Sequence, residues 1–117
     1  MKIEKNNITM VRGDTEGLSI NLFGEKGETL EVIPFEPGDR VFFTVKKNAN
    51  TKDVLIQKIV SEFTDGAAVF RIDHADTSGL SYSRYVYDIQ VIRGDVVKTI
   101  IPMSYFTLSE EVTHDGP

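Results

Sequence analysis

The sequence has no cysteine among its 117 residues, which excludes a disulfide framework and a zinc site built on thiolates. A reducing cytosol is therefore compatible with the chain. It also has no apolar run of about 18 residues, so we expect no membrane-spanning helix. Basic residues are fewer than acidic ones, 13 against 18, and the net charge of −5 argues against a general nucleic-acid binder.

Alanine, a strong helix former, occurs only at four positions: Ala49, Ala67, Ala68 and Ala75. Val, Ile, Thr, Phe and Tyr dominate instead, and these residue types suit a pleated, half-buried surface. Dense Gly, Pro, Asn and Asp punctuation separates short apolar runs, which predicts an all-β sandwich or barrel. The length predicts a single soluble domain over residues 1–117, and the N-terminal segment MKIEKNNITM lacks the apolar stretch of a secretory signal.

Alternating apolar and polar residues predict the strands, and we expect one short helical turn near 74–79 between two of them. The predicted strands are 7–11, 17–23, 29–33, 40–46, 67–72, 83–93, 96–101 and 104–108. A two-residue loop with glycine first, Gly94-Asp95, predicts a type II′ hairpin that pairs Arg93 with Val96. The polar segment 109–117 is expected to be a flexible tail.

The segment 53–63 fits two interpretations. Ile56, Ile59 and Phe63 have the spacing of a helix face, whereas Val54 and Ile56 also share a strand face. We favour a strand, because strands are predicted on both sides of the segment.

The residues before the tyrosine-rich strand predict a structural corner. Asp76 or Thr77 can cap the short helical turn through a side-chain oxygen, and Leu80 would fill the core. A buried leucine followed by a tyrosine near the start of the next strand is typical of the tyrosine corner of Greek-key sandwiches. Tyr85 is the first candidate for that tyrosine and Tyr82 the second.

Residues with catalytic or metal-binding chemistry are few. Asp73, His74 and Asp76 form the only cluster of metal-ligand types, and a solvated turn explains them more simply. The Arg-Gly-Asp string at 12–14 has a near repeat at 93–95, which fits two tight turns better than cell adhesion. With no cysteine nucleophile, no Gly-x-Ser-x-Gly elbow and no phosphate-binding loop, we expect no catalytic residue, metal or cofactor, and therefore not an enzyme.

Several strands carry apolar residues on both faces. Phe42 and Phe43 are adjacent, so they point to opposite sides of a strand and cannot enter the same core. The same holds for Val96-Val97 and for the run 99–101, whose adjacent side chains also cannot all enter one core. The sequence therefore predicts a second covered surface, with a partner subunit as its natural cover and Phe42, Val96 and Ile100 as candidate interface residues.

An ordered set of motifs resembles the N-terminal domain of the phage baseplate upper protein family, which belongs to small virion proteins of phages and prophages of Gram-positive bacteria. The motifs are RGDT at 12–15, DRVFFTVKK at 39–47, LIQK at 55–58, the corner residues Asp76-Thr77, Leu80 and Tyr82, YVYDIQ at 85–90, Thr99-Ile100 and FTL at 106–108. The resemblance covers residues 10–113.

This resemblance implies an immunoglobulin-like antiparallel β-sandwich of seven to nine strands. It also implies a structural role in the tail or baseplate of a virion assembled in the bacterial cytoplasm. The partners would be other tail or baseplate proteins and further copies of the chain, without nucleic acid or membrane. The alternative is a carbohydrate- or host-surface-binding module, which needs exposed aromatic rings such as Tyr87 and Tyr105 beside a polar groove.

Overall fold

The computed structural model describes residues 1–27 and 29–110, and these contain ten strands and one short helix. The elements are β1 (Lys2–Glu4), β2 (Asn7–Val11), β3 (Glu16–Ile20), β4 (Leu22–Lys26), β5 (Thr29–Ile33), β6 (Arg40–Lys46), β7 (Val54–Val60), β8 (Ala68–Ile72), α1 (His74–Ser78), β9 (Arg84–Arg93) and β10 (Val96–Ser109). The prediction of an all-β fold with one short helical turn is confirmed, with one strand more than the upper limit of the range expected. No helix in the described part is long and apolar enough to cross a membrane.

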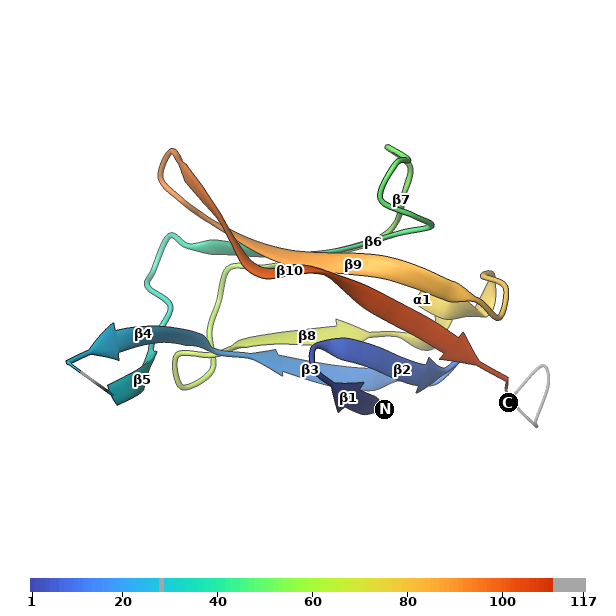
Figure 1. Cartoon of the computed structure of the whole chain (residues 1–117), viewed down its shortest axis with the longest axis horizontal. Helices are drawn as coiled ribbons and strands as arrows, with labels where there is room; N and C mark the ends of the chain where they lie inside the picture. The colour runs from blue at the N-terminus through green and yellow to red at the C-terminus, as the bar shows by residue number, and fades with distance from the viewer. Residues whose placement is uncertain (28, 111–117) are drawn as a thin grey trace.

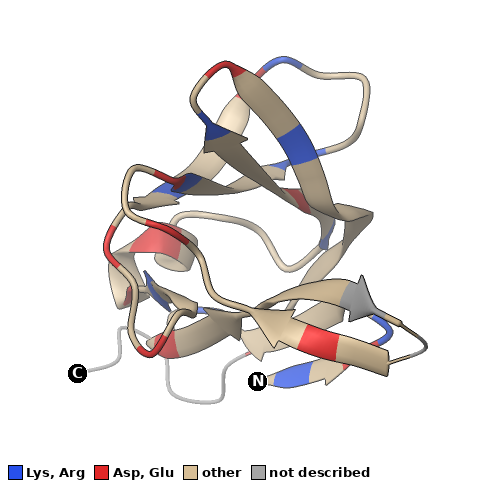
Figure 2. Cartoon of the chain, turned by 90° about the vertical axis from the view of Figure 1, so that its left-hand side faces the viewer, with Lys and Arg blue, Asp and Glu red and all other residues tan. Residues whose placement is uncertain are grey.

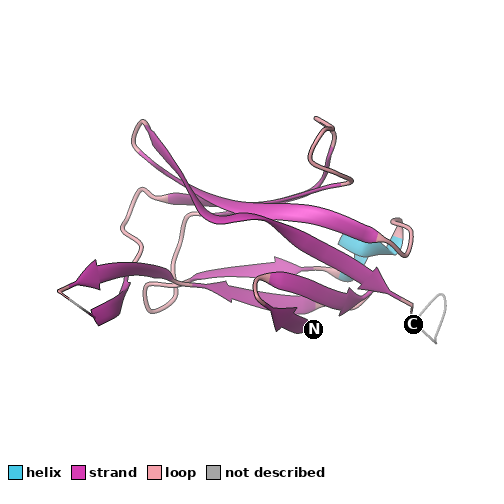
Figure 3. Cartoon of the chain, viewed as in Figure 1, coloured by secondary structure: helices cyan, strands magenta, loops and turns pink. Residues whose placement is uncertain are grey.

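The strands form two layers and one projecting hairpin (Figure 1). A six-stranded sheet has the order β1-β2-β10-β9-β6-β7, and the two-stranded sheet β3-β8 lies against its inner face. All neighbours in the large sheet are antiparallel except β2 and β10, which run parallel. The pair β4-β5 extends beyond the end of β3-β8. Most of the chain is in strands, as Figure 3 shows. This arrangement resembles a β-sandwich, and its immunoglobulin-like topology stays a prediction.

The core lies between the two sheets because side chains of one parity on each strand point inward. In the large sheet, Val41, Phe43 and Val45 of β6 are buried, as predicted from their alternation. Phe43 is central: its ring lies 5.8 Å from that of Phe70 in the opposite layer and 5.4 Å from that of Tyr87 on the neighbouring strand. Such aromatic contacts add to the burial of apolar area in holding the two layers together.

Two predicted strands need correction, and one strand was not predicted. The predicted strand 17–23 is two strands, because the chain leaves partner β8 at Ile20 and takes β5 as its new partner from Leu22. The predicted strand 104–108 is the end of a single long β10, in which register shifts near Ile101 absorb the extra residues around Pro102. The strand β1 was not predicted, because its three residues are all exposed and show no alternation.

The structure also bears on three other predicted segments: the ambiguous segment 53–63, the β9–β10 turn and the C-terminal tail. Residues 54–60 form strand β7, which confirms the strand interpretation of this segment. Gly94, with φ of 62°, is the first residue of the β9–β10 turn, and Arg93 pairs with Val96 as predicted. The predicted tail begins too early, because Ser109 still belongs to β10 and its carbonyl accepts a hydrogen bond from the Arg12 amide at 3.1 Å. The rest of that prediction, residues 111–117, lies outside the described residues.

An ion pair between buried Asp39 and half-exposed Arg93 fixes the loop before β6. Asp39 is 1% exposed, and its two carboxylate oxygens accept hydrogen bonds from the Arg93 guanidinium at 2.7 Å each. The Glu36 amide donates a third bond to the same carboxylate at 2.9 Å. The hydrogen bonds from Arg93 hold the pKa of Asp39 below its usual 3.8, and the carboxylate in turn raises the pKa of Arg93.

Candidate functional site

The outer face of the six-stranded sheet presents side chains of the other parity. On β6 and β9 the register places Phe42 opposite Gln90 and Thr44 opposite Asp88. Lys46 lies opposite Val86 in the same pairing. The two-stranded sheet β3-β8 packs on the opposite, inner face of the large sheet. The outer face therefore presents a mixed row of polar and apolar side chains to solvent.

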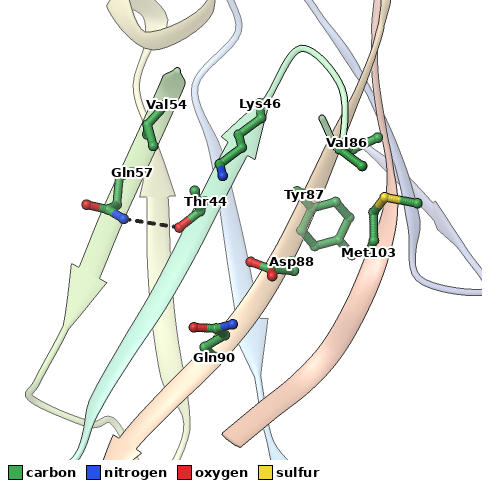
Figure 4. Close-up of a pocket in the computed structure, with 10 residues that line it drawn as sticks. Thr44, Lys46, Val54, Gln57, Val86, Tyr87, Asp88, Gln90 and Met103 are labelled. Carbon is green, nitrogen blue, oxygen red and sulfur yellow. Dashed lines mark hydrogen bonds between the residues drawn. The ribbon is translucent and has the colours of Figure 1, made fainter. Parts of the chain in front are cut away.

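A shallow pocket of about 370 Å³ lies on this outer face. Side chains from β6, β7, β9 and β10 and from the loop after β6 surround it (Figure 4). The lining residues are Thr44, Lys46, Ala49, Val54, Gln57, Val86, Tyr87, Asp88, Gln90 and Met103. Its size is at the lower end of the range for small-molecule sites, roughly 300–1,000 Å³.

The Lys46 charge acts on Asp88 in the pocket without direct contact. Burial raises the pKa of Asp88, and the nearby Lys46 charge partly opposes that rise. No ion pair or hydrogen bond joins either group to another described residue. By contrast, the Gln57 amide donates to the Thr44 hydroxyl at 3.2 Å, which orients both side chains (Figure 4).

The predicted interface residues Phe42, Val96 and Ile100 do not gather on one surface. Phe42 lies on the outer face of the sheet, half-buried, with the Arg40 guanidinium 5.7 Å from its ring centre. Val96 is 59% exposed but lies opposite Arg93, on the core side of the β9–β10 tip where no second layer covers it. Ile100 is half-buried and packs against the core, so it offers less surface than the other two.

A group of exposed apolar side chains that the sequence did not predict lies on the β4–β5 hairpin, residues 22–26 and 29–33, here called the arm. Phe23 and Val32 are directly opposite each other in the register, and Leu30 follows two positions along the same face. Their side chains are 60%, 54% and 69% exposed, respectively. The alternation in 29–33 was visible in the sequence, but nothing local indicates that this face lacks a covering layer.

The predicted structural corner has a defined hydrogen-bond pattern. The Tyr85 hydroxyl donates to the Ser81 carbonyl at 2.8 Å, four residues upstream. Leu80 packs against the core, and its amide donates to the Thr77 carbonyl at 2.9 Å. Asp76 caps the start of α1 through a side-chain oxygen, since its carboxylate accepts a hydrogen bond from the Asp73 amide at 2.7 Å, while Asp73 itself holds the N-cap position.

The acidic residues around α1 form ion pairs with basic side chains of the strands β7 and β8. The Lys58 ammonium lies 2.8 Å from the Asp76 carboxylate, and Arg71 pairs with Asp73. The hydrogen bond from Arg71 lowers the pKa of Asp73. His74 donates through Nδ1 to the Gly13 carbonyl at 2.6 Å. Among the described residues, no three His, Asp or Glu side chains are placed to hold a metal ion.

The Arg-Gly-Asp turn at 12–14 packs on the same helix. The Gly13 amide donates to the Thr77 hydroxyl at 2.8 Å, and Arg12 donates to the Leu80 carbonyl at 3.1 Å. The Arg12 guanidinium also lies over the Tyr82 ring at 4.2 Å. These contacts tie the turn to the corner and give it a structural role.

The aromatic residues required by the carbohydrate alternative are in different environments. Tyr87 is 3% exposed, burial raises its pKa to about 12, and its hydroxyl donates to the Asn6 carbonyl. Tyr105 is 44% exposed, with the Arg84 guanidinium 4.7 Å from its ring centre. A stacking platform made of both rings is therefore not formed.

Basic and acidic residues are scattered along the strands and loops (Figure 2).

Comparison with known proteins gives no family assignment. No model of a known protein family matches the chain, and no curated protein matches it either.

Proposed function

We propose that this chain is a non-enzymatic structural component of a phage or prophage particle, in its tail or baseplate, that assembles through protein–protein contacts. The ordered motifs between residues 10 and 113 support the phage assignment. The observation that supports assembly is the arm, whose strands pair with each other and with no third strand in the described part of the chain. Its partners are other tail or baseplate proteins and further copies of the chain.

Two physical arguments make the arm an interaction element. An isolated two-stranded hairpin is only marginally stable in water, and a third strand or a packed layer supplies what it lacks. In addition, full burial of a side chain such as Phe23, Leu30 or Val32 is worth about 1.5–3 kcal/mol relative to leaving it exposed. A neighbouring protein that covers the arm would gain this energy and could also pair with a free strand edge.

The direct test of the proposal is assembly of the purified full chain. Light scattering and sedimentation over a range of concentrations should show either self-association or a complex with tail or baseplate proteins co-expressed from neighbouring genes. The double variant Phe23→Ser with Leu30→Ser should lose that association. Val69→Ser, at an exposed position of β8, is the matched control and should retain it.

The proposal fails if the chain is a strict monomer at all concentrations and its gene neighbours encode no tail or baseplate proteins. It also fails as an account of the arm if the double variant, verified as folded by circular dichroism, assembles as well as the unmodified chain does.

A further inference from the structure

The outer-face pocket is a second site, distinct from the arm in both position and chemistry. Its lining comes from β6, β7, β9 and β10, whereas the arm consists of β4 and β5.

Two charged side chains of opposite sign face this pocket without contacting each other. Lys46 and Asp88 both line it, on the neighbouring strands β6 and β9, and neither has a hydrogen-bond or ion-pair partner in the described part of the chain (Figure 4). A partly buried carboxylate without a protein partner must be satisfied from the solvent side. The space between the ammonium and the carboxylate therefore suits a group that can accept from one and donate to the other.

The other polar groups of the pocket have the same double character. The Thr44 hydroxyl and the Gln57 and Gln90 amides each contain both a donor and an acceptor. Thr44 and Gln57 are already oriented by their mutual hydrogen bond at 3.2 Å. Sugar hydroxyls match such groups well, because every hydroxyl donates one hydrogen bond and accepts others.

We propose that this pocket binds a neutral saccharide, with a ligand hydroxyl donating to the Asp88 carboxylate and accepting from the Lys46 ammonium. The one positive and one negative side chain leave the pocket without a net preference for an ion. Val54, Val86 and Met103 provide apolar surface for the C–H faces of a sugar ring. Recognition in this site comes from polar side chains and does not require the stacking of Tyr87.

The experiment is a titration of the isotope-labelled full chain followed by its amide NMR spectrum. The probes are glucose, galactose, N-acetylglucosamine, rhamnose, maltose and lactose, with glycine and free lysine as zwitterionic comparisons at equal concentrations. At least one sugar should produce saturable shifts centred on Thr44, Asp88 and Gln90, while the zwitterions produce none there.

Matched variants test whether the pocket residues carry the binding. Asp88→Asn should weaken the affinity for that sugar at least tenfold, about the loss expected when a charged hydrogen-bond acceptor is removed. Asp95→Asn, at the exposed β9–β10 turn, should leave the affinity unchanged. Lys46→Met should weaken binding likewise, and Lys98→Met on exposed strand surface should not. Thermal unfolding of each variant establishes that it is folded.

Three outcomes would overturn the proposal. They are no saturable shift with any of the six sugars, shifts at the pocket that glycine reproduces, and binding that Asp88→Asn leaves intact. None of these outcomes bears on the assembly of the arm, so the two proposals fail separately.

Discussion

At the scale of single residues, Asp39 shows how much depends on a partner that is distant in sequence. Asp39 follows Pro37-Gly38 and has the local pattern of a solvated turn, yet it is nearly fully buried. The reason is Arg93, 54 residues away, which pairs with it through two hydrogen bonds. No local pattern could have predicted this pair, because it exists only once β6 and β9 are neighbours.

The Asp39 carboxylate should make the stability of the chain sensitive to acid. Its pKa in the folded state is below the unfolded value of 3.8, so the charged form contributes stability above about pH 4 and loses it as the pH falls further. Asp39→Asn should lower the free energy of unfolding at neutral pH by about 1–2 kcal/mol, because charged hydrogen bonds are lost beside a half-exposed arginine. The variant should also depend less on pH between 5 and 2, roughly the range over which paired carboxylates take up protons.

Urea unfolding of both proteins at several pH values measures this prediction, with the exposed Asp53→Asn as the control. An unfolding curve of Asp39→Asn that keeps the full acid dependence of the unmodified chain would contradict it.

The tyrosine corner gives a second prediction at this scale. Tyr85→Phe removes the hydroxyl that donates to the Ser81 carbonyl at 2.8 Å and keeps the buried ring. We expect a loss of about 1 kcal/mol, the usual net value of one such hydrogen bond. Tyr82→Phe should cost little, because its ring contact with Arg12 does not use the hydroxyl. Denaturant midpoints of the two variants make the comparison, and equal losses would argue against a special role for Tyr85.

At the scale of elements, the strands with strict alternation were the predictable ones. The bounds of β2, β5 and β6 agree with those predicted, since each has short apolar alternation between turn residues. The division between β3 and β4 was not predictable, because the apolar alternation of Leu18, Ile20 and Leu22 continues unbroken through a change of partner strand. Pairing partners, not side-chain pattern, determine that boundary.

The turn before β8 allows a prediction about backbone strain. Gly66 has φ of 79°, and a Cβ there would lie 2.7 Å from the Pro34 Cβ. Gly94 has a similar φ of 62° but has no atom within 4 Å of such a Cβ. Both alanine variants should lose roughly 1 kcal/mol from the left-handed backbone, and Gly66→Ala should lose clearly more because Pro34 must also move.

Thermal unfolding of Gly66→Ala and Gly94→Ala tests this difference directly. A Gly94→Ala variant at least as destabilised as Gly66→Ala would show that the contact with Pro34 is relieved without cost.

At the scale of the whole molecule, local stability should fall from the centre of the large sheet toward the arm. Strands β6 and β9 have a hydrogen-bonded neighbour on each side and bury most of their inward side chains. The arm has neither advantage. Amide hydrogen exchange of the dilute chain should therefore be slowest in β6 and β9 and fastest among the paired strands in β4 and β5.

The same measurement links stability to assembly. Under conditions where the chain associates, the amides of β4 and β5 should become protected, while those of β6 and β9 change little. Equal protection of the arm in dilute and associated samples would contradict the view that a partner covers it.

The parallel pairing of β2 with β10 has a consequence for the order of folding during synthesis. The Tyr105 amide binds the Asn7 side chain, which is 98 residues earlier in the chain. Ile8 and Met10 therefore leave the ribosome long before the strand that completes their sheet exists. Since non-local strand pairs form slowly, closure of the sheet is expected to be a late event in folding. Until then the apolar face of β2 is a surface on which a chaperone can act.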